Sequence, residues 1–121
     1  MADPFFDTNI LIDWLRDVPE ASAELARYNV NRISRLVWTE ILAGETLETR
    51  DTVRGLISPF EVVEIDARIA AVAADIHYRT KMKLMDAYIL ATAQVNGAIL
   101  ITRNTKDFPA AMPGIRVPYS L

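Results

Sequence analysis

Short apolar runs of strand length alternate with helical patterns along the whole chain. The strongest strand candidate is the run Ala-Ile-Leu-Ile at residues 98–101, and residues 60–65 form another that is rich in β-branched side chains. Strands that are continuous apolar runs are typical of sheets buried on both faces, and helices between them favour parallel pairing. The pattern therefore predicts an α/β fold in which helices cover a parallel sheet.

The same periodicities place the individual elements. Strands are expected at residues 4–6, 32–34, 60–65, 98–101 and 115–117, and helices at residues 10–15, 19–28, 36–43, 47–57, from Asp66 onward, and 86–95. Thr8 or Asn9 is the expected cap of the first helix, and Asp66 that of the fifth. Ligands of such folds bind outside the carboxyl ends of the strands, so residues that follow strands are the first candidates for a site.

Composition narrows the classes of protein. A chain of 121 residues suits one domain, residues 1–121, and its lack of cysteine excludes disulfides, thiolate metal sites and a cysteine nucleophile. No apolar run approaches the ~18 residues of a membrane span, and the acidic start does not suit a signal peptide, so we expect a cytoplasmic protein. The net charge of −3 argues against a generally basic nucleic-acid-binding surface but allows a small acidic site.

Three carboxylates stand out by position. Asp7 follows the first predicted strand, while Glu40 and Asp86 lie within apolar segments. If they converge, each like-charge pair at ~4 Å costs on the order of 4 kcal/mol at an effective dielectric of 20, so retained protons or a cation must offset the repulsion. With oxygen ligands alone, a hard ion such as Mg²⁺ or Mn²⁺ is the expected cation.

Each acidic or amide residue also has a purely structural interpretation. Asp7 and Asp86 could cap helices, and Glu40 could face solvent. Asn104 and Asp107, which follow the strongest strand, could be ordinary turn residues. Whether the carboxylates converge is the question that the sequence leaves to the structure.

Four segments together resemble the PIN-domain nucleases, and among these the small VapC-like toxin ribonucleases of prokaryotic toxin–antitoxin pairs. The segments are FDTNILI at residues 6–12, WTEILAGE at 38–45, MDAYILATA at 85–93 and ITRNTKDF at 101–108. Their order and spacing match the family over essentially the whole chain.

The resemblance implies a three-layer α/β fold and a Mg²⁺- or Mn²⁺-dependent site that hydrolyses RNA phosphodiester bonds. In the family pattern, the acids that match Asp7 and Asp86 hold the metal, and the one that matches Glu40 acts through water or as a proton acceptor. Thr8 or Asn9 would support Asp7 by hydrogen bonding or contact the substrate. This chain departs from the family at its fourth acid.

Asn104 stands where the family commonly has that fourth acid. Asparagine offers a neutral oxygen ligand but no base, so either Asp107 supplies the missing charge or the site works with three carboxylates. The departure puts a two-metal mechanism in doubt. It also keeps open a PIN-fold module that binds RNA or a partner without catalysis.

Four bases are expected at the border of the acidic site. Arg103 and Lys106 follow the strongest strand and are predicted to contact RNA phosphates, while Lys81 and Lys83 precede Asp86. A solvated charged face is the alternative for Lys81 and Lys83. The single histidine, His77, and both tryptophans are expected to be structural.

The resemblance further implies a homodimer and a small antitoxin whose tail fills an apolar groove. The early helices offer Ile10, Leu11, Trp14, Leu15, Leu36, Val37 and Ile41 for that groove, although all of them could instead be core. A receiver-type signalling domain is a different class of similar length. It would need adjacent acids after the first strand, where this chain has Asp7-Thr8-Asn9, and a phospho-accepting aspartate after a central strand, whereas Asp51 lies in a helical stretch.

Overall fold

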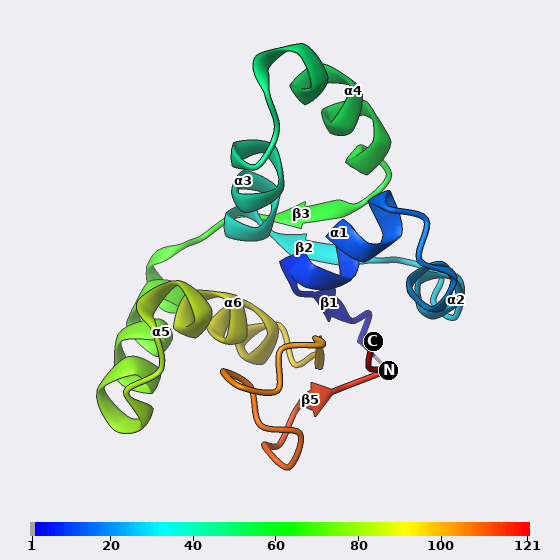
Figure 1. Ribbon diagram of the computed structural model, residues 1–121. Helices are drawn as coiled ribbons and strands as arrows, with labels where there is room; N and C mark the ends of the chain where they lie inside the picture. The colour runs from blue at the N-terminus through cyan, green and yellow to red at the C-terminus, as the bar shows by residue number, and fades with distance from the viewer. Residues whose placement is uncertain (1) are drawn as a thin grey trace.

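The computed structural model describes residues 2–121, which form five strands and six helices (Figure 1). The strands are β1 (Phe5–Phe6), β2 (Arg32–Ser34), β3 (Glu61–Val63), β4 (Leu100–Ile101) and β5 (Ile115–Arg116). The helices are α1 (Thr8–Leu15), α2 (Pro19–Ala26), α3 (Arg35–Ala43), α4 (Leu47–Ile57), α5 (Ala67–Thr80) and α6 (Leu84–Val95). All four strand pairings are parallel, which confirms the predicted α/β fold.

The order of strands in the sheet is β3-β2-β1-β4-β5, with β1 at the centre. Phe5 of β1 faces Arg32 of β2 on one side and Leu100 of β4 on the other. From β1 the chain first adds strands on one side of the sheet and later on the other. The loops after β1 and β4 therefore leave the sheet in different directions, and in such sheets ligands bind in the crevice beyond the carboxyl ends of these two strands.

The core consists of strand residues and of the helix faces that lie on them. Phe6, Ile33, Leu100 and Ile101 are fully buried, as expected for strands covered on both faces. Helix α6 packs along α5 (Figure 1), and its buried residues are Ala87, Ile89, Leu90, Ala91, Thr92 and Ala93. These residues lie on more than one side of the helix, as expected from a segment that is apolar nearly all round. Within residues 2–121, no helix is both long and apolar enough to cross a membrane.

Several helix boundaries differ from those predicted. Asp7, rather than Thr8 or Asn9, caps α1, because its Oδ1 accepts a hydrogen bond of 2.8 Å from the Thr8 backbone N–H. Helix α6 begins at Leu84, so Asp86 lies inside the first turn and is not the cap. Asp66 caps α5 as predicted, accepting 2.8 Å from the Ile69 N–H.

The strands are also shorter than the apolar runs that predicted them. The run at residues 98–101 contributes only Leu100 and Ile101 to the sheet. The run at residues 60–65 contributes Glu61–Val63, and the second helix ends at Ala26 instead of residue 28. Apolar side chains at the ends of a strand are buried by covering helices even where strand pairing has stopped, so hydropathy overestimates strand length.

Candidate active site

Asp7 lies at the crevice between the loops after β1 and β4, and it is held by three donors. Its Oδ1 accepts the Thr8 N–H at 2.8 Å, while its Oδ2 accepts the Thr102 hydroxyl at 2.8 Å and the Asn9 amide at 3.1 Å. Its exposed fraction is only 5%. Burial raises the pKa of Asp7 and the charge of Glu40 adds to this, although the hydrogen bonds partly offset the shift. The carboxylate is therefore fixed in position, and its negative charge is unfavourable there without a cation.

Thr102 links the two loops of the crevice. This fully buried residue follows β4 directly, and its Oγ1 accepts hydrogen bonds from the Asn104 N–H at 3.0 Å and the Asn9 amide at 3.3 Å, besides donating to Asp7. The side-chain oxygen Oδ1 of Asn9 in turn accepts the Arg103 backbone N–H at 3.0 Å. Thr102 was not among the predicted site residues. A polar side chain directly after the strongest strand was the sequence signal for it.

Glu40 approaches the site from α3. Its Oε1 accepts a hydrogen bond of 2.7 Å from the Thr8 hydroxyl, which connects α3 to the first turn of α1. The side chain is exposed to solvent. The two interpretations of Glu40 are thus compatible, since it faces solvent at the mouth of the same crevice.

The negative charges of the other acids of the crevice act on Asp86. Burial and the negative charges of Asp107, Asp7 and Glu40 raise its pKa from 3.8 to about 6, against a lowering effect of Lys83. Asp107, Asp7 and Glu40 are therefore near enough to Asp86 for their charges to act on it. Within residues 2–121, no hydrogen bond supports the Asp86 carboxylate.

Asn104 and Asp107 form one turn after β4. The Asn104 amide donates to the Asp107 carboxylate at 2.7 Å, and the Asp107 N–H donates to the Asn104 side-chain oxygen at 3.2 Å. The turn interpretation of both residues is therefore correct. It also fixes the Asp107 carboxylate where its charge acts on Asp86.

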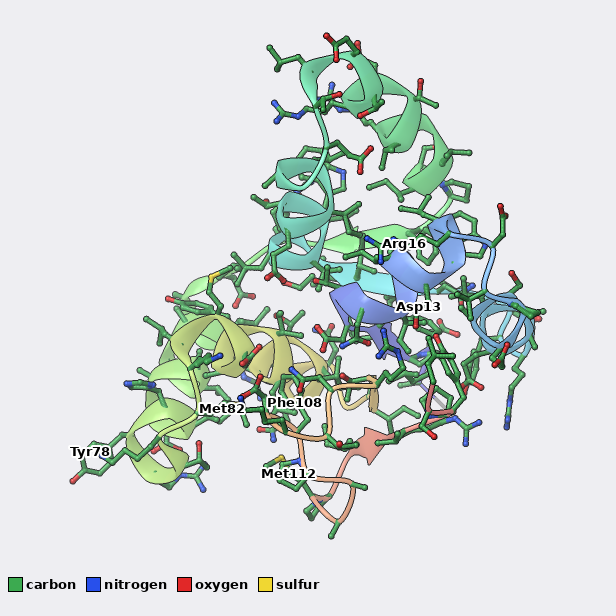
Figure 2. All side chains as sticks on the ribbon, in the orientation of Figure 1. Asp13, Arg16, Tyr78, Met82, Phe108 and Met112 are labelled. Atoms are coloured by element: carbon green, nitrogen blue, oxygen red, sulfur yellow. The ribbon has the colours of Figure 1, made fainter. Side chains whose placement is uncertain are left out.

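Arg103 lies on the other side of its loop, away from the acids. Its guanidinium forms two hydrogen bonds with Asp13 of α1, at 2.7 and 3.0 Å, and the Tyr119 hydroxyl donates to the same carboxylate at 2.8 Å. Figure 2 labels Asp13, on α1, and Arg16, which follows the last residue of that helix. This geometry gives Arg103 a structural role in place of the predicted phosphate contact.

The three predicted lysines, unlike Arg103, form no ion pair within residues 2–121. Lys81, Lys83 and Lys106 are exposed and line a common hollow of about 390 Å³ together with Asp107.

His77 is structural as predicted, because its Nδ1 bonds the Met82 carbonyl at 2.6 Å. The expectation that the tryptophans pack also holds. Trp14 meets the Phe60 ring edge to face at 5.5 Å, and Trp38 lies under the Arg35 and Arg54 guanidinium groups at 4.7 and 5.9 Å.

The predicted apolar groove on the early helices is largely core. Ile10, Leu11 and Val37 have no exposed surface. Leu15 and Ile41 do line a hollow of about 310 Å³ between α1, α3 and α4, which also contains Leu56. Arg16, Glu40 and Glu45 complete this α1–α4 hollow, so it adjoins the acidic crevice.

The donor set of the crevice suits a hard divalent cation. Its candidate ligands are carboxylate and amide oxygens, and the raised pKa values of Asp7 and Asp86 indicate negative charge that a cation would stabilise. The side chains of residues 2–121 do not, however, form a ready-made group of three or more acid or histidine ligands around one point. The crevice thus has the chemistry of a Mg²⁺ or Mn²⁺ site, and the acids would have to move together around the ion.

Residues 5–111 match the family described as PIN domain, and the chain belongs to this family. The fold agrees with that of solved structures. A chain of a toxin–antitoxin complex from Klebsiella pneumoniae is 40% identical, with a TM-score of 0.91 over 98% of this chain and 100% of that chain.

More distant structures share the fold at lower identity. They include FitAcB from Neisseria gonorrhoeae, with 23% identity, a TM-score of 0.80 and coverage of 97% of this chain and 99% of that one. DNA-bound VapBC from Salmonella typhimurium is also 23% identical, with a TM-score of 0.79 and 96% of both chains covered. A comparison with curated proteins gave no match. The predicted PIN-domain membership is confirmed, and it excludes the receiver-type alternative.

Proposed function

We propose that this protein is a Mg²⁺- or Mn²⁺-dependent endoribonuclease and the toxin of a VapBC-type toxin–antitoxin pair. The observation that carries the proposal is the group of acids beyond β1 and β4. Thr8 donates hydrogen bonds to both Asp7 and Glu40, and burial, together with the charges of Asp107, Asp7 and Glu40, raises the pKa of Asp86 to about 6. Membership of the PIN-domain family supports a nuclease. The 40% identity to a chain of a toxin–antitoxin complex supports the toxin role.

Each acid has a distinct part in the proposed reaction. Asp7 and Asp86 hold the cation, and Asp7 is already oriented by Thr8, Asn9 and Thr102. When bound, the cation activates water and stabilises the charge that develops on the phosphate. Glu40, exposed at the mouth of the crevice, accepts a proton from the attacking water.

Asp107 takes the place of the family's fourth acid in this proposal. Its carboxylate acts on Asp86, while Asn104 keeps it in position through two hydrogen bonds. Asn104 therefore serves as a positioning residue. The fourth negative charge is retained three residues later in the chain.

The first test compares wild type with Asp7→Asn on labelled RNA. Wild type should cleave with Mg²⁺ or Mn²⁺ and not with EDTA, and the variant should be slower by more than about 100-fold because an amide neither balances the cation's charge nor binds it as tightly. Asp51→Asn is the matched control, because Asp51 is an exposed acid on α4 whose side chain is 92% exposed. Its rate should equal that of wild type.

Three outcomes would contradict the proposal. Cleavage that persists in EDTA would exclude a metal-dependent site, and full activity of Asp7→Asn, with folding checked by circular dichroism, would exclude the crevice. Intact RNA with wild type, although RNA and metal both bind, would favour the alternative of a PIN-fold binding module.

A homodimer in the cytoplasm and an antitoxin partner complete the proposal. Similar chains come from solved toxin–antitoxin complexes, and the α1–α4 hollow adjoins the acids that an antitoxin tail would have to block. Tyr78, Leu84 and Met85 are exposed large apolar residues that could serve a dimer interface. Light scattering of the purified chain tests the dimer, and a monomeric mass would contradict it.

A further inference from the structure

The lysines of this chain are confined to one place. There are only three, Lys81, Lys83 and Lys106, and all of them line the hollow of about 390 Å³, here called the lysine hollow. None forms an ion pair within residues 2–121, whereas six of the arginines do. An acidic protein thus gathers its three lysines on a single concave surface, where they outnumber the one acid that lines it, Asp107.

Two segments far apart in sequence build this hollow. The turn between α5 and α6 supplies Lys81 and Lys83, and the segment after β4 supplies Lys106. Met82 and Met112, labelled in Figure 2, line the hollow from these two segments.

The α5–α6 turn is held in a fixed conformation. Lys81 adopts a left-handed backbone with φ of 62°, which is uncommon for a residue other than glycine, and its N–H donates to the His77 carbonyl at 2.9 Å. The His77 ring bonds the Met82 carbonyl at 2.6 Å, and the Met82 N–H donates to the Thr80 hydroxyl at 3.1 Å. With Met82 buried as an anchor, the lysines on either side of it stay exposed and are presented together. The left-handed residue is the C-cap of α5, which is a common way for a helix to end, and these contacts give the turn a defined conformation.

The lysine hollow adjoins the acidic crevice. Asp107 lines the hollow and also raises the pKa of Asp86, and Lys83 acts on Asp86 in the opposite sense. On the far side of the crevice, the α1–α4 hollow contains Glu40 and Glu45 with one arginine. The electrostatic surroundings of the acids are therefore asymmetric. A polyanion approaching the acids is therefore attracted more strongly on the side of the lysine hollow than on the side of the α1–α4 hollow.

We propose that the lysine hollow binds backbone phosphates of the RNA segment next to the bond that is cleaved. The RNA then leaves the acidic crevice across the α5–α6 turn and not through the α1–α4 hollow. Lysine suits this role because its ammonium group is a mobile point charge that accepts any phosphate without reading sequence. The inference rests on the proposed ribonuclease function, and the following experiment separates the two.

Binding is measured in the Asp7→Asn background, so that RNA stays intact, by titrating labelled single-stranded RNA at several salt concentrations. The triple variant Lys81→Gln, Lys83→Gln and Lys106→Gln should reduce the slope of log K against log[salt] by about 2, because each lost phosphate contact contributes about 0.7. Near 0.1 M salt this corresponds to a loss of affinity of up to about 100-fold. The conservative triple variant Lys81→Arg, Lys83→Arg and Lys106→Arg keeps the three charges, so its salt slope should equal that of the Asp7→Asn protein.

The matched control removes the same charge elsewhere. Arg27→Gln, Arg54→Gln and Arg68→Gln change three exposed arginines that lie outside the lysine hollow. This triple control should leave the salt slope unchanged. An equal loss in the control would overturn the inference, because net charge alone would then explain the binding.

The remaining outcomes are equally decisive. If the glutamine variant keeps the full salt slope while wild type cleaves RNA, the lysine hollow does not bind the substrate and the proposed function stands. If the variant instead loses only its binding to a polyglutamate peptide, the hollow serves an acidic protein segment and the inference fails. Wild type that neither binds nor cleaves RNA would overturn both proposals. Each single lysine variant, with folding checked by thermal melting, should lower the slope by about 0.7.

Discussion

Asp86→Asn is expected to make the metal-free protein more stable at pH 8 and to lower RNA cleavage by more than about 100-fold. Burial and the neighbouring acids raise the pKa of Asp86 from 3.8 to about 6 in the folded state. Below pH 3.8 the carboxyl is protonated in both states and its contribution to stability is greatest. That contribution falls as pH rises to about 6 and stays low above it. Asparagine remains neutral throughout, so the variant avoids this loss.

Melting temperatures at pH 4, 6 and 8, each in EDTA and in MgCl₂, measure the effect. In EDTA, the melting temperature of the variant relative to that of wild type should increase between pH 4 and pH 6, and the increase should persist at pH 8. MgCl₂ should raise the melting temperature of wild type, because a ligand that binds only the folded state stabilises it. It should not raise the melting temperature of the variant. The control Asp51→Asn should show neither change. A variant less stable than wild type at pH 8 in EDTA would contradict the clustering of the acids, and one still stabilised by Mg²⁺ would exclude Asp86 as a ligand.

The fold and the acids of the crevice were predictable because they depend on local sequence. Continuous apolar runs predict strands covered on both faces, and parallel strands direct their carboxyl ends to one edge. Asp7 follows such a strand, so its position followed from the strand pattern. The position of Asp86 relative to it required the packing of α6, which only the resemblance supplied.

The orientation of Arg103 was not predictable from its place after a strand. Thr102 and Arg103 lie beyond the end of β4, where the chain bends, so the strand pattern does not fix the directions of their side chains. Thr102 reaches Asp7, and Arg103 reaches Asp13 on the other side. Asp13 is 90 residues away in sequence, and no local pattern connects the two. The three lysines were expected at the border of the acidic site, but only the fold shows that Lys106 shares one hollow with the α5–α6 turn.

Arg103→Met is expected to lower the free energy of unfolding by about 3 kcal/mol, or the melting temperature by roughly 10 °C. Asp13 has a side chain only 5% exposed, and Arg103 and Tyr119 are its partners. Removing the guanidinium leaves a buried carboxylate with the Tyr119 hydroxyl alone. Arg116→Met is a matched comparison, because Arg116 pairs with buried Glu24 at 2.7 and 3.0 Å, and Tyr28 donates to the same carboxylate at 2.8 Å. It should be destabilising to a similar extent.

The pH dependence of stability shows whether the loss of the Arg103–Asp13 pair causes the destabilisation. Burial alone would raise the pKa of Asp13, but hydrogen bonds from Arg103 and Tyr119 bring it below 3.8, so wild type gains stability above that pH and loses it as pH falls further. Without Arg103, the effect of burial dominates, so the pKa of Asp13 should be raised instead of lowered. Urea unfolding should therefore show the largest deficit of Arg103→Met at pH 7 and a smaller one near pH 4. A variant with unchanged stability but a salt slope for RNA reduced by about 0.7 would instead make Arg103 a phosphate contact.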